Sequence, residues 1–387
     1  MIRSYRYKLT PTRSQERELD TWLELLRELY NAALQERRDA WKKQRVRVTA
    51  FDQMKVVPEI RAARAEYNAL SVAAMRGAIR TCDKAFAAFF RRVKAGEKPG
   101  YPRFKGRDRF DTISIDDLGG KNPVVAGGKR LAVPLLGKLR IRLHRPLGGV
   151  PKAIRITRTA AGWYVSIQCI DVPAKPLLKT GASVGVDVGL TTLAATSDGQ
   201  LFENARPLKQ ATARLRKAQR RVSRRKKGST HRREAVRCLA RAHEHVANVR
   251  RERAITIARA LVAKYDVICI EDVNVKGMCR GMFSKHIADA GWSTFTHWLD
   301  VKAEEAGREI VRVNPAGTSQ VCSECGIEVR KDLSVRVHCC PHCGLVLDRD
   351  VNAARNILRA GRALRRDGSL GDSPMTREVS VASASSY

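Results

Sequence analysis

Residues 318–358, TSQVCSECGIEVRKDLSVRVHCCPHCGLVLDRDVNAARNIL, hold two cysteine pairs just before an amphipathic helix. The pairs, each followed by glycine and separated by fourteen residues, are Cys322-x2-Cys325 and Cys340-x2-Cys343. A CxxC turn directs two sulfur atoms at one ion, and two such turns complete a tetrahedral Zn²⁺ site. Four thiolates leave no position for water, so the spacing predicts one structural zinc ion. Cys339 is a possible substitute ligand, but Cys340 gives the matched turn.

Three widely spaced carboxylates flank this zinc element. Asp187 lies in the apolar segment VGVDVG (184–189), Glu271 closes the segment VICIE (267–271), and Asp350 opens the final helix. A charged group in a buried strand needs a metal, a cation or an opening to the surface. Acids at two strand ends and a helix start are the arrangement with which a two-metal nuclease holds Mg²⁺ against a phosphate. Asp350 taken alone can also be an ordinary acid stabilised by the helix dipole.

Around these acids, residues 183–365 read as strand, strand, long helices, strand, helix and strand, which predicts an α/β layout. Upstream, residues 3–9 alternate with a period of two and predict a single strand, followed by a helical block. Further strands are predicted at 112–115, 130–133, 139–143, 154–157 and 163–170. A single strand is not stable without neighbouring strands to pair with. Residues 3–9 are therefore expected in one barrel with these later strands, and the helices are expected to be inserted between them.

The charge of the chain indicates its kind of partner. Lys and Arg number 74 against 39 Asp and Glu, which gives a formal net charge of +35. Such a charge destabilises the compact state by self-repulsion, whereas binding a polyanion removes the penalty and releases counterions. Residues 206–253 are the most basic segment and still keep a narrow apolar stripe, so one helix face packs while the rest is cationic. No apolar run approaches the roughly 20 residues of a spanning helix, which favours nucleic acid over a membrane.

The remaining cysteines are scattered and do not form a disulfide framework. Their distribution suits a reducing cytosol better than an oxidising compartment. They are Cys82, Cys169, Cys238, Cys269, Cys279 and Cys339.

Several sequence motifs of this chain resemble those of a known protein family. In chain order, GVDVG (185–189), IEDVN (270–274), TSQVCSECG (318–326), CPHCG (340–344) and LDRDVNAARNI (347–357) are similar to TnpB, the transposon-encoded relative of type V CRISPR nucleases. YKLTPTRSQ (7–15), LYNAAL (29–34), FFRRVK (89–94), GYPRFK (100–105), LRKAQRRVSRRKKGS (215–229) and DAGWSTF (289–295) extend the resemblance over nearly the whole chain.

The resemblance implies a transposon-encoded, RNA-guided DNA endonuclease in a prokaryotic cytoplasm, associated with the nucleoid when bound to DNA. It would bind a guide RNA derived from the transposon end, read a short transposon-adjacent motif in double-stranded DNA, and cut both strands at one RuvC-like site. Guide pairing would carry sequence specificity. The implied cofactors are two catalytic Mg²⁺ ions and one structural Zn²⁺ ion. We expect one protein chain per guide RNA and no membrane partner.

The resemblance also assigns roles to residues. Asp187, Glu271 and Asp350 match the three catalytic, Mg²⁺-binding positions, and Cys322, Cys325, Cys340 and Cys343 match a zinc ribbon. In the family, the helix that here bears Arg76, Arg80 and Lys84 reads the adjacent motif. The other expected nucleic-acid contacts are Arg220, Arg221, Arg224, Arg225, Lys226 and Lys227.

The fold class expected from the residues and the resemblance together is multidomain α+β: an RNase H-like RuvC nuclease domain with an inserted zinc ribbon, and an N-terminal β-barrel (wedge) domain with an inserted helical recognition lobe. The expected boundaries are wedge 1–10, recognition lobe 11–95, wedge 96–180, nuclease 181–319, zinc ribbon 320–346, nuclease 347–365 and a disordered tail 366–387.

Three other functions compete with guided cleavage. An RNA-guided DNA-binding repressor would lack nuclease acids, but all three are present. A DNA-strand transferase (transposase) would also use a carboxylate triad, although the ribbon just before the third acid favours the nuclease. A basic zinc-ribbon RNA-binding protein would leave Asp187 and Glu271 unexplained.

Overall fold

The computed structural model describes residues 1–119, 122–125, 127–279, 281, 284–332 and 334–366. The chain divides into two compact units, with the boundary between Pro173 and Ala174. Unit 1 is Met1–Pro173, and unit 2 begins at Ala174. The tail predicted to be disordered lies, apart from Arg366, outside the described residues.

Unit 1 is built on a six-stranded antiparallel sheet in the order β2-β5-β6-β1-β4-β3. Its strands are β1 (Arg3–Leu9), β2 (Thr112–Ile115), β3 (Arg130–Val133), β4 (Gly137–Arg142), β5 (Val150–Thr159) and β6 (Gly162–Ile170). Strand β1 pairs with β6 on one side and β4 on the other. Residues 3–9 were predicted to lie in one barrel with strands more than 100 residues later. Their place in a common sheet is confirmed, whereas closure of these strands into a barrel stays a prediction.

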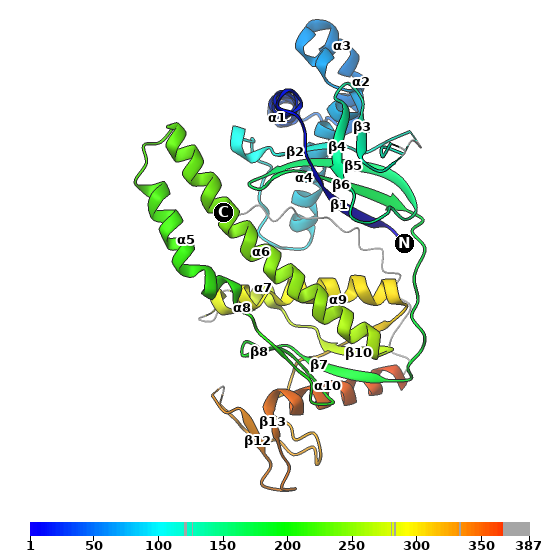
Figure 1. Cartoon of the computed structure of the whole chain (residues 1–387), viewed down its shortest axis with the longest axis vertical. Coiled ribbons are helices and arrows are strands. Elements are labelled where there is room, and N and C mark those ends of the chain that lie inside the picture. The colour runs from blue at the N-terminus through cyan, green and yellow to red at the C-terminus, as the bar shows by residue number, and fades with distance from the viewer. Residues whose placement is uncertain (120–121, 126, 280, 282–283, 333, 367–387) are drawn as a thin grey trace. The chain divides into compact units, whose positions relative to one another are not determined.

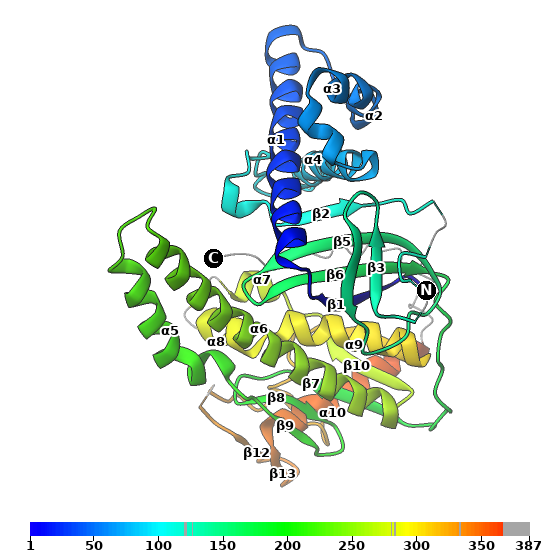
Figure 2. The same cartoon turned by 45° about the horizontal axis from the view of Figure 1, so that its top comes forward.

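Helices interrupt the strands of this sheet between β1 and β2. They are α1 (Arg13–Gln44), α2 (Ala50–Lys55), α3 (Val57–Ala63), the 3₁₀ helix η1 (Ala65–Ala69) and α4 (Val72–Lys94), with a second 3₁₀ turn, η2 (Arg107–Arg109), before β2. Thr12 starts α1 because its hydroxyl accepts the Gln15 backbone N–H while the Gln15 side chain accepts the Thr12 N–H. Helices α2 and α3 lie beside the C-terminal half of α1 (Figure 2).

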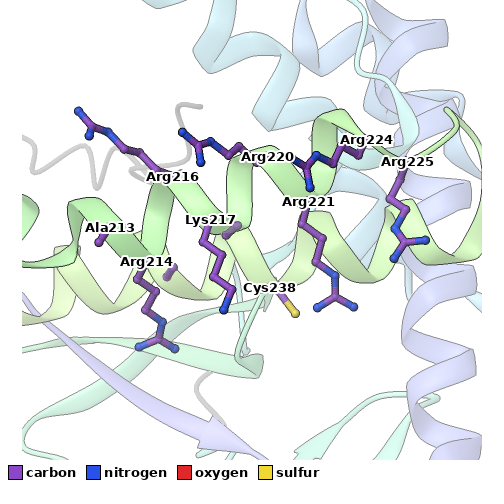
Figure 3. Close-up of a pocket in the computed structure, with 11 residues that line it drawn as sticks. Ala213, Arg214, Arg216, Lys217, Arg220, Arg221, Arg224, Arg225 and Cys238 are labelled. Carbon is purple, nitrogen blue, oxygen red and sulfur yellow. The ribbon is translucent and has the colours of Figure 1, made fainter.

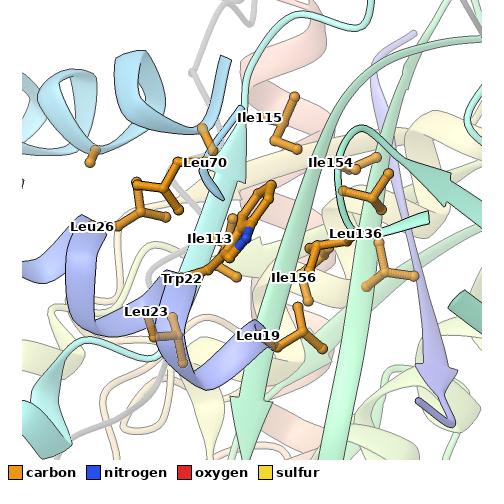
Figure 4. Close-up of a cluster of buried hydrophobic side chains, with 14 of the residues drawn as sticks. Leu19, Trp22, Leu23, Leu26, Leu70, Ile113, Ile115, Leu136, Ile154 and Ile156 are labelled. Atoms are coloured by element: carbon orange, nitrogen blue, oxygen red, sulfur yellow. The ribbon is translucent and has the colours of Figure 1, made fainter. Parts of the chain in front are cut away.

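The core of unit 1 lies between α1 and the sheet. Leu19, Trp22, Leu23 and Leu26 recur at helical spacing on α1 and are all buried. Figure 4 shows them facing isoleucines of β2 and β5. Burying such side chains contributes roughly 1.5–3 kcal/mol each, so this face fixes α1 on the sheet.

Unit 2 holds a five-stranded mixed sheet in the order β11-β10-β7-β8-β9. Its strands are β7 (Ser183–Asp187), β8 (Thr192–Thr196), β9 (Leu201–Glu203), β10 (Val267–Glu271) and β11 (Glu309–Val313), and a separate hairpin is made by β12 (Val337–Cys339) and β13 (Val346–Asp348). The pairs β7–β10 and β10–β11 are parallel. Parallel strands are usually covered on both faces, which explains the nearly continuous apolar runs of β7 and β10.

Helices cover both faces of this sheet (Figure 1). The helices of unit 2 are α5 (Pro207–Ser223), α6 (Thr230–Lys264), α7 (Val275–Met278), α8 (Ser284–Ala290), α9 (Trp292–Ala306) and α10 (Arg349–Arg366). Helices α6 and α9 share a core with Val184, Val186, Ile268 and Ile270. Helix α10 packs through Ile357 against Val267 and Cys269, on the other face. The α/β layout predicted for this part of the chain is confirmed.

No helix in the described part of the chain is both long and apolar enough to cross a membrane.

Helix α10 approaches this sheet very closely at Gly185 of β7. A Cβ atom placed there would lie 1.9 Å from the Ala354 carbonyl oxygen of α10. Backbone atoms cannot yield as a flexible side chain does, so α10 would have to move away from the strand.

We therefore predict that Gly185→Ala lowers the free energy of unfolding of unit 2 by about 1–3 kcal/mol through overpacking. Gly106→Ala is the control, because a Cβ atom there meets nothing within 4 Å. Hydrogen exchange of peptides covering β7 and α10 would measure the effect. Equal protection in the two variants would contradict the proposed tight packing.

Candidate functional site

The pairing of β7 with β10 places two of the three predicted acids at the same end of the sheet. Strands β7 and β10 are parallel neighbours, and Ile270 pairs with Val186, so Glu271 and Asp187 follow at the same end of the sheet. Because Val186 and Ile270 face α6 and α9, the next side chain on each strand faces α10. Carboxyl ends of parallel strands are where α/β sheets commonly place functional groups.

Helix α10 supplies the third acid at the same edge. Asp350 lies in the first turn of α10, one turn before Ala354, whose carbonyl faces Gly185. The Asp348 carboxylate caps this helix by accepting the backbone N–H groups of Asp350 and Val351, at 2.8 and 3.2 Å. The Asp348 carboxylate therefore caps the helix, whereas the Asp350 side chain faces the strands.

Burial disfavours the ionised form of all three acids at this edge. Burial, followed by the negative charges of Glu271 and Asp350, raises the pKa of Asp187 well above its usual value. Burial also raises the pKa of Glu271 and of Asp350. Three carboxylates that are partly removed from water and repel one another are costly as anions unless a cation joins them.

These carboxylates fit divalent cations in donor chemistry, because hard ions such as Mg²⁺ take carboxylate oxygens. Among the described residues, however, only the cysteines form a group of three or more potential ligand atoms within 4.8 Å of one another. The ligand oxygens of the three acids are therefore not all within that distance of one another.

Thr318 is a site residue that sequence reasoning missed. Its hydroxyl donates a hydrogen bond to Glu271 Oε1 and is itself nearly buried. The hydrogen bond favours the ionised carboxylate and lowers the pKa of Glu271, against the larger effect of burial. Thr318 opens the TSQ segment before the first CxxC turn, but no periodicity links position 318 to position 271.

Arg336 is the second residue that was missed. Its guanidinium Nη1 lies 3.8 Å from Asp350 Oδ1, and its Nη2 donates to Thr191 Oγ1 at 2.6 Å. The side chain is about half exposed. A guanidinium held beside a carboxylate cluster, and still reachable from solvent, can contact a bound phosphate.

The four predicted cysteines do converge. The Cys322–Cys343 and Cys325–Cys340 sulfur separations are both 3.6 Å. A tetrahedral ion with Zn–S bonds of about 2.3 Å requires sulfur atoms ~3.8 Å apart. Backbone N–H groups of Cys343 and His342 point at Cys340 and lower the pKa of its thiol. The cluster therefore fits a structural Zn²⁺ site, while Cys339 is exposed and outside it.

Two buried asparagines of α10 connect the cysteine cluster to the carboxylates. Asn352 donates to the Val321 carbonyl at 2.8 Å and accepts the Ser323 N–H at 2.9 Å, on either side of Cys322. Asn356 donates to the carbonyls of Thr318 and Val321, at 2.8 and 2.7 Å. One face of α10 thus fixes both the first cysteine turn and the residue that holds Glu271.

The predicted basic segment forms a helical hairpin with a cationic groove. Helices α5 and α6 pack through Leu215, Ala242 and Val246. Arginines project from α5 around a groove of about 1060 Å³ (Figure 3). The cations that line it are Arg214, Arg216, Lys217, Arg220, Arg221, Arg224 and Arg225. Lys226 and Lys227 are exposed in the turn that follows α5.

The N-terminus of α5 is held by Asp289 of the DAGWSTF segment. The buried Asp289 carboxylate accepts the backbone N–H groups of Leu208 and Lys209, at 2.9 and 3.1 Å. Arg250 of α6 donates to the same carboxylate at 2.9 Å. These bonds fix the cationic helix at its first turn, which sequence spacing gave no means of predicting.

Arg76, Arg80 and Lys84 lie on one face of α4, in unit 1, four residues apart. Arg80 and Lys84 approach the Asp116 carboxylate at 3.8 and 3.7 Å. Arg76 is exposed. Their role in reading DNA stays a prediction.

The cysteine cluster generates a prediction about metal content. Cys340→Ser should lose the zinc ion and expose α10 to hydrogen exchange, because structural thiolate sites can contribute on the order of 10 kcal/mol to folding. His342→Ala is the control, since this side chain lies within the turn but outside the cluster. Mass spectrometry of the metal should give one Zn²⁺ per chain for wild type and control. Zinc retained by Cys340→Ser would contradict the assignment.

Three parts of the chain match models of known protein families. Residues 166–281 match the family described as "Probable transposase", residues 292–357 the "Cas12f1-like, TNB domain", and residues 1–45 a "Helix-turn-helix domain". That last description does not fit the structure, in which residues 1–45 form strand β1 and one uninterrupted helix, α1.

Two relatives cover most of the chain. A Streptomyces pristinaespiralis protein named "Putative RNA-guided DNA endonuclease" is 34% identical over 373 residues, which are 93% of this chain and 90% of the relative. "Putative RNA-guided DNA endonuclease InsQ" of Escherichia coli K12 is 29% identical, over 79% of this chain and 78% of the relative. A solved structure of CasPhi-2 bound to crRNA covers 93% of this chain and 98% of its own, at 10% identity; its TM-score of 0.46 is too low to support a conclusion.

The first relative exceeds 30% identity across nearly its full length, and the matched domains follow the same order as the sequence motifs. The chain therefore belongs to the TnpB family, also described as the IS605 OrfB transposase family.

Proposed function

We propose that this protein is an RNA-guided DNA endonuclease that cuts both strands of its target at one site formed by Asp187, Glu271 and Asp350. The observation that carries the proposal is the convergence of these acids at one sheet edge, where burial and mutual charge raise the pKa of Asp187. The names of the relatives supply the substrate and the guide. The unit 2 sheet, with acids on β7, β10 and α10, would be the RNase H-like RuvC domain.

Each acid has a role in this mechanism. Asp187, Glu271 and Asp350 would hold two Mg²⁺ ions, whose chemistry when bound would be to activate a water molecule and to stabilise the leaving oxygen of the phosphodiester. Thr318 orients the Glu271 carboxylate, and the exposed guanidinium of Arg336 would pair with a phosphate oxygen of the bound strand. The cysteine cluster would hold one Zn²⁺ that keeps α10, and with it Asp350, in place.

The partners would be a guide RNA from the transposon end and target double-stranded DNA, with one chain per guide. The groove on α5 would contact phosphates, and the exposed face of α4 would approach the transposon-adjacent motif. In unit 1 the sheet would serve as the wedge barrel and the helices as the recognition lobe. In a cell we expect the complex in a prokaryotic cytoplasm.

Strand transfer is the second candidate, because one matched family is described as "Probable transposase". A transferase would join the cut end to another DNA molecule, whereas an endonuclease leaves free ends. Incubation of the guided complex with a labelled target separates the two by product length. The names of the relatives favour an endonuclease, and therefore products with free ends.

Cleavage should depend on the acid side chains. We predict that Asp187→Asn reduces guided cleavage to below about one hundredth of wild type and leaves DNA binding nearly unchanged, because the acid holds ions rather than the duplex. Asp272→Asn is the control, since this exposed acid directly follows Glu271. Cleavage rate and DNA affinity would be measured on the same complex. A variant Asp187→Asn that cuts at the wild-type rate would refute the site.

Thr318 should matter through its hydroxyl group. We predict that Thr318→Val slows cleavage by about 10- to 100-fold, as loss of hydrogen bonds to metal ligands commonly does, while Thr318→Ser keeps most of the rate. Zinc content should stay at the wild-type level in both variants. If serine fails to rescue the rate, the side chain acts through packing instead.

The arginines of the α5 groove should contribute to RNA affinity through phosphates. Replacing Arg220, Arg221, Arg224 and Arg225 with alanine should lower the slope of log K against log salt by up to about three, whereas the four Arg→Lys changes should preserve it. Filter binding of guide RNA at several salt concentrations measures this. A slope unchanged by alanine would mean that these charges face solvent.

A further inference from the structure

A cluster of aromatic side chains lies on unit 1, where α4 ends and the chain continues toward β2. Phe89 packs on Phe90 and on Tyr101, with ring centroids 5.1 and 5.3 Å apart. Phe86 packs on the same two partners, at 6.4 and 5.7 Å. Phe104 lies nearby in the sequence, under the guanidinium of Arg38 at 5.1 Å.

Three of these rings are open to solvent. Phe90 is 60% exposed, Tyr101 is 46% exposed and Phe104 is 44% exposed. A core cluster would hide such rings, since each buries 150–250 Å² in a typical interior. The exposed faces therefore remain available for contact with another molecule.

The loop that carries Tyr101 and Phe104 is fixed to α1. The Asn31 side chain accepts the Lys105 backbone N–H at 2.8 Å and donates to the Lys105 carbonyl at 3.0 Å. Arg27 donates to the same carbonyl at 3.4 Å. The rings are thus held in position before any ligand arrives, which reduces the entropy lost on binding.

The surroundings of the cluster are cationic. Between residues 86 and 105 the only acid is Glu97, and the cations are Arg91, Arg92, Lys94, Lys98, Arg103 and Lys105. Arg92 lies against the loop, because a Cβ atom at Gly100 would be 3.2 Å from its Nη1. Exposed aromatic faces beside unbalanced positive charge suit a ligand that is flat and negatively charged, which favours a nucleic acid over an apolar protein partner.

We propose that the exposed rings of Phe90 and Tyr101 form a stacking platform for unpaired nucleotides of an RNA strand, with the adjacent cations on its phosphates. Bases in a duplex have both faces covered, whereas RNA loops and ends present free faces that stack on aromatic side chains. The assignment to RNA rests on the proposed function, in which RNA is the constitutive partner. The platform would order an unpaired part of the guide against the helices of unit 1.

The test compares binding of labelled 20-nucleotide oligouridine, oligothymidine and an RNA duplex of equal length to the full chain. Phe90→Ala combined with Tyr101→Ala should weaken oligouridine binding by about 5- to 100-fold, because stacking contributes roughly 1–3 kcal/mol per base. Duplex binding should stay within twofold of wild type. Phe90→Trp combined with Tyr101→Phe retains the rings and should restore oligouridine affinity.

Each other outcome overturns part of the proposal. Equal loss for oligouridine and the duplex would show that charge or folding, and not stacking, had been disturbed. Loss for oligothymidine alone would assign the platform to a DNA strand. Unchanged oligouridine binding by the alanine variant would remove the platform and leave the proposed function standing, whereas a wild-type chain that bound no RNA would overturn both. Ultraviolet crosslinking of oligouridine to the wild-type chain, followed by mass spectrometry, should place the adduct within residues 86–105.

Discussion

The seating of α10 on β7 is the contact on which the candidate site depends. Only a residue without a Cβ atom permits it, because the Ala354 carbonyl faces Gly185 at a distance that no side chain could tolerate. Gly185 and Asp187 share one face of the strand, and Ala354 lies one turn after Asp350. The same contact that fixes the helix therefore brings two acids together, and strand pairing adds Glu271.

The cysteine cluster reinforces this seating from outside the sheet. Asn352 and Asn356 are one helical turn apart, buried, and bonded to the segment that runs from Thr318 to Ser323. That segment ends at the first cysteine turn and begins at the hydroxyl group that holds Glu271. A metal at the cysteines would thereby stabilise two of the three acids without contacting either, since their orientation follows the position of α10 and of Thr318.

The sequence predicts which residues form this site better than it predicts the contacts between them. Cysteine spacing identified the sulfur atoms that converge, and strand patterns located Asp187 and Glu271 at neighbouring strand ends. The role of Thr318 could not be foreseen, because its contact with Glu271 joins residues 47 positions apart and has no periodic signal. Arg336 was missed for the same reason: its contact with Asp350 is made from the segment between the cysteine pairs, directly before β12. The strands of unit 1 were predictable from their alternating apolar and polar residues. That β1 pairs with later strands such as β6 was inferred only because a single strand needs neighbouring strands to be stable.

The central claim is that Asp187, Glu271 and Asp350 bind catalytic cations while the cysteines bind only zinc. Anomalous diffraction from the complex with guide RNA and target DNA, soaked in Mn²⁺ and recorded at the manganese and zinc edges, tests it directly. The account predicts manganese between the three carboxylates and beside a DNA phosphate, with zinc at the four sulfur atoms. Manganese absent from the carboxylates of a complex that cuts DNA would contradict the account.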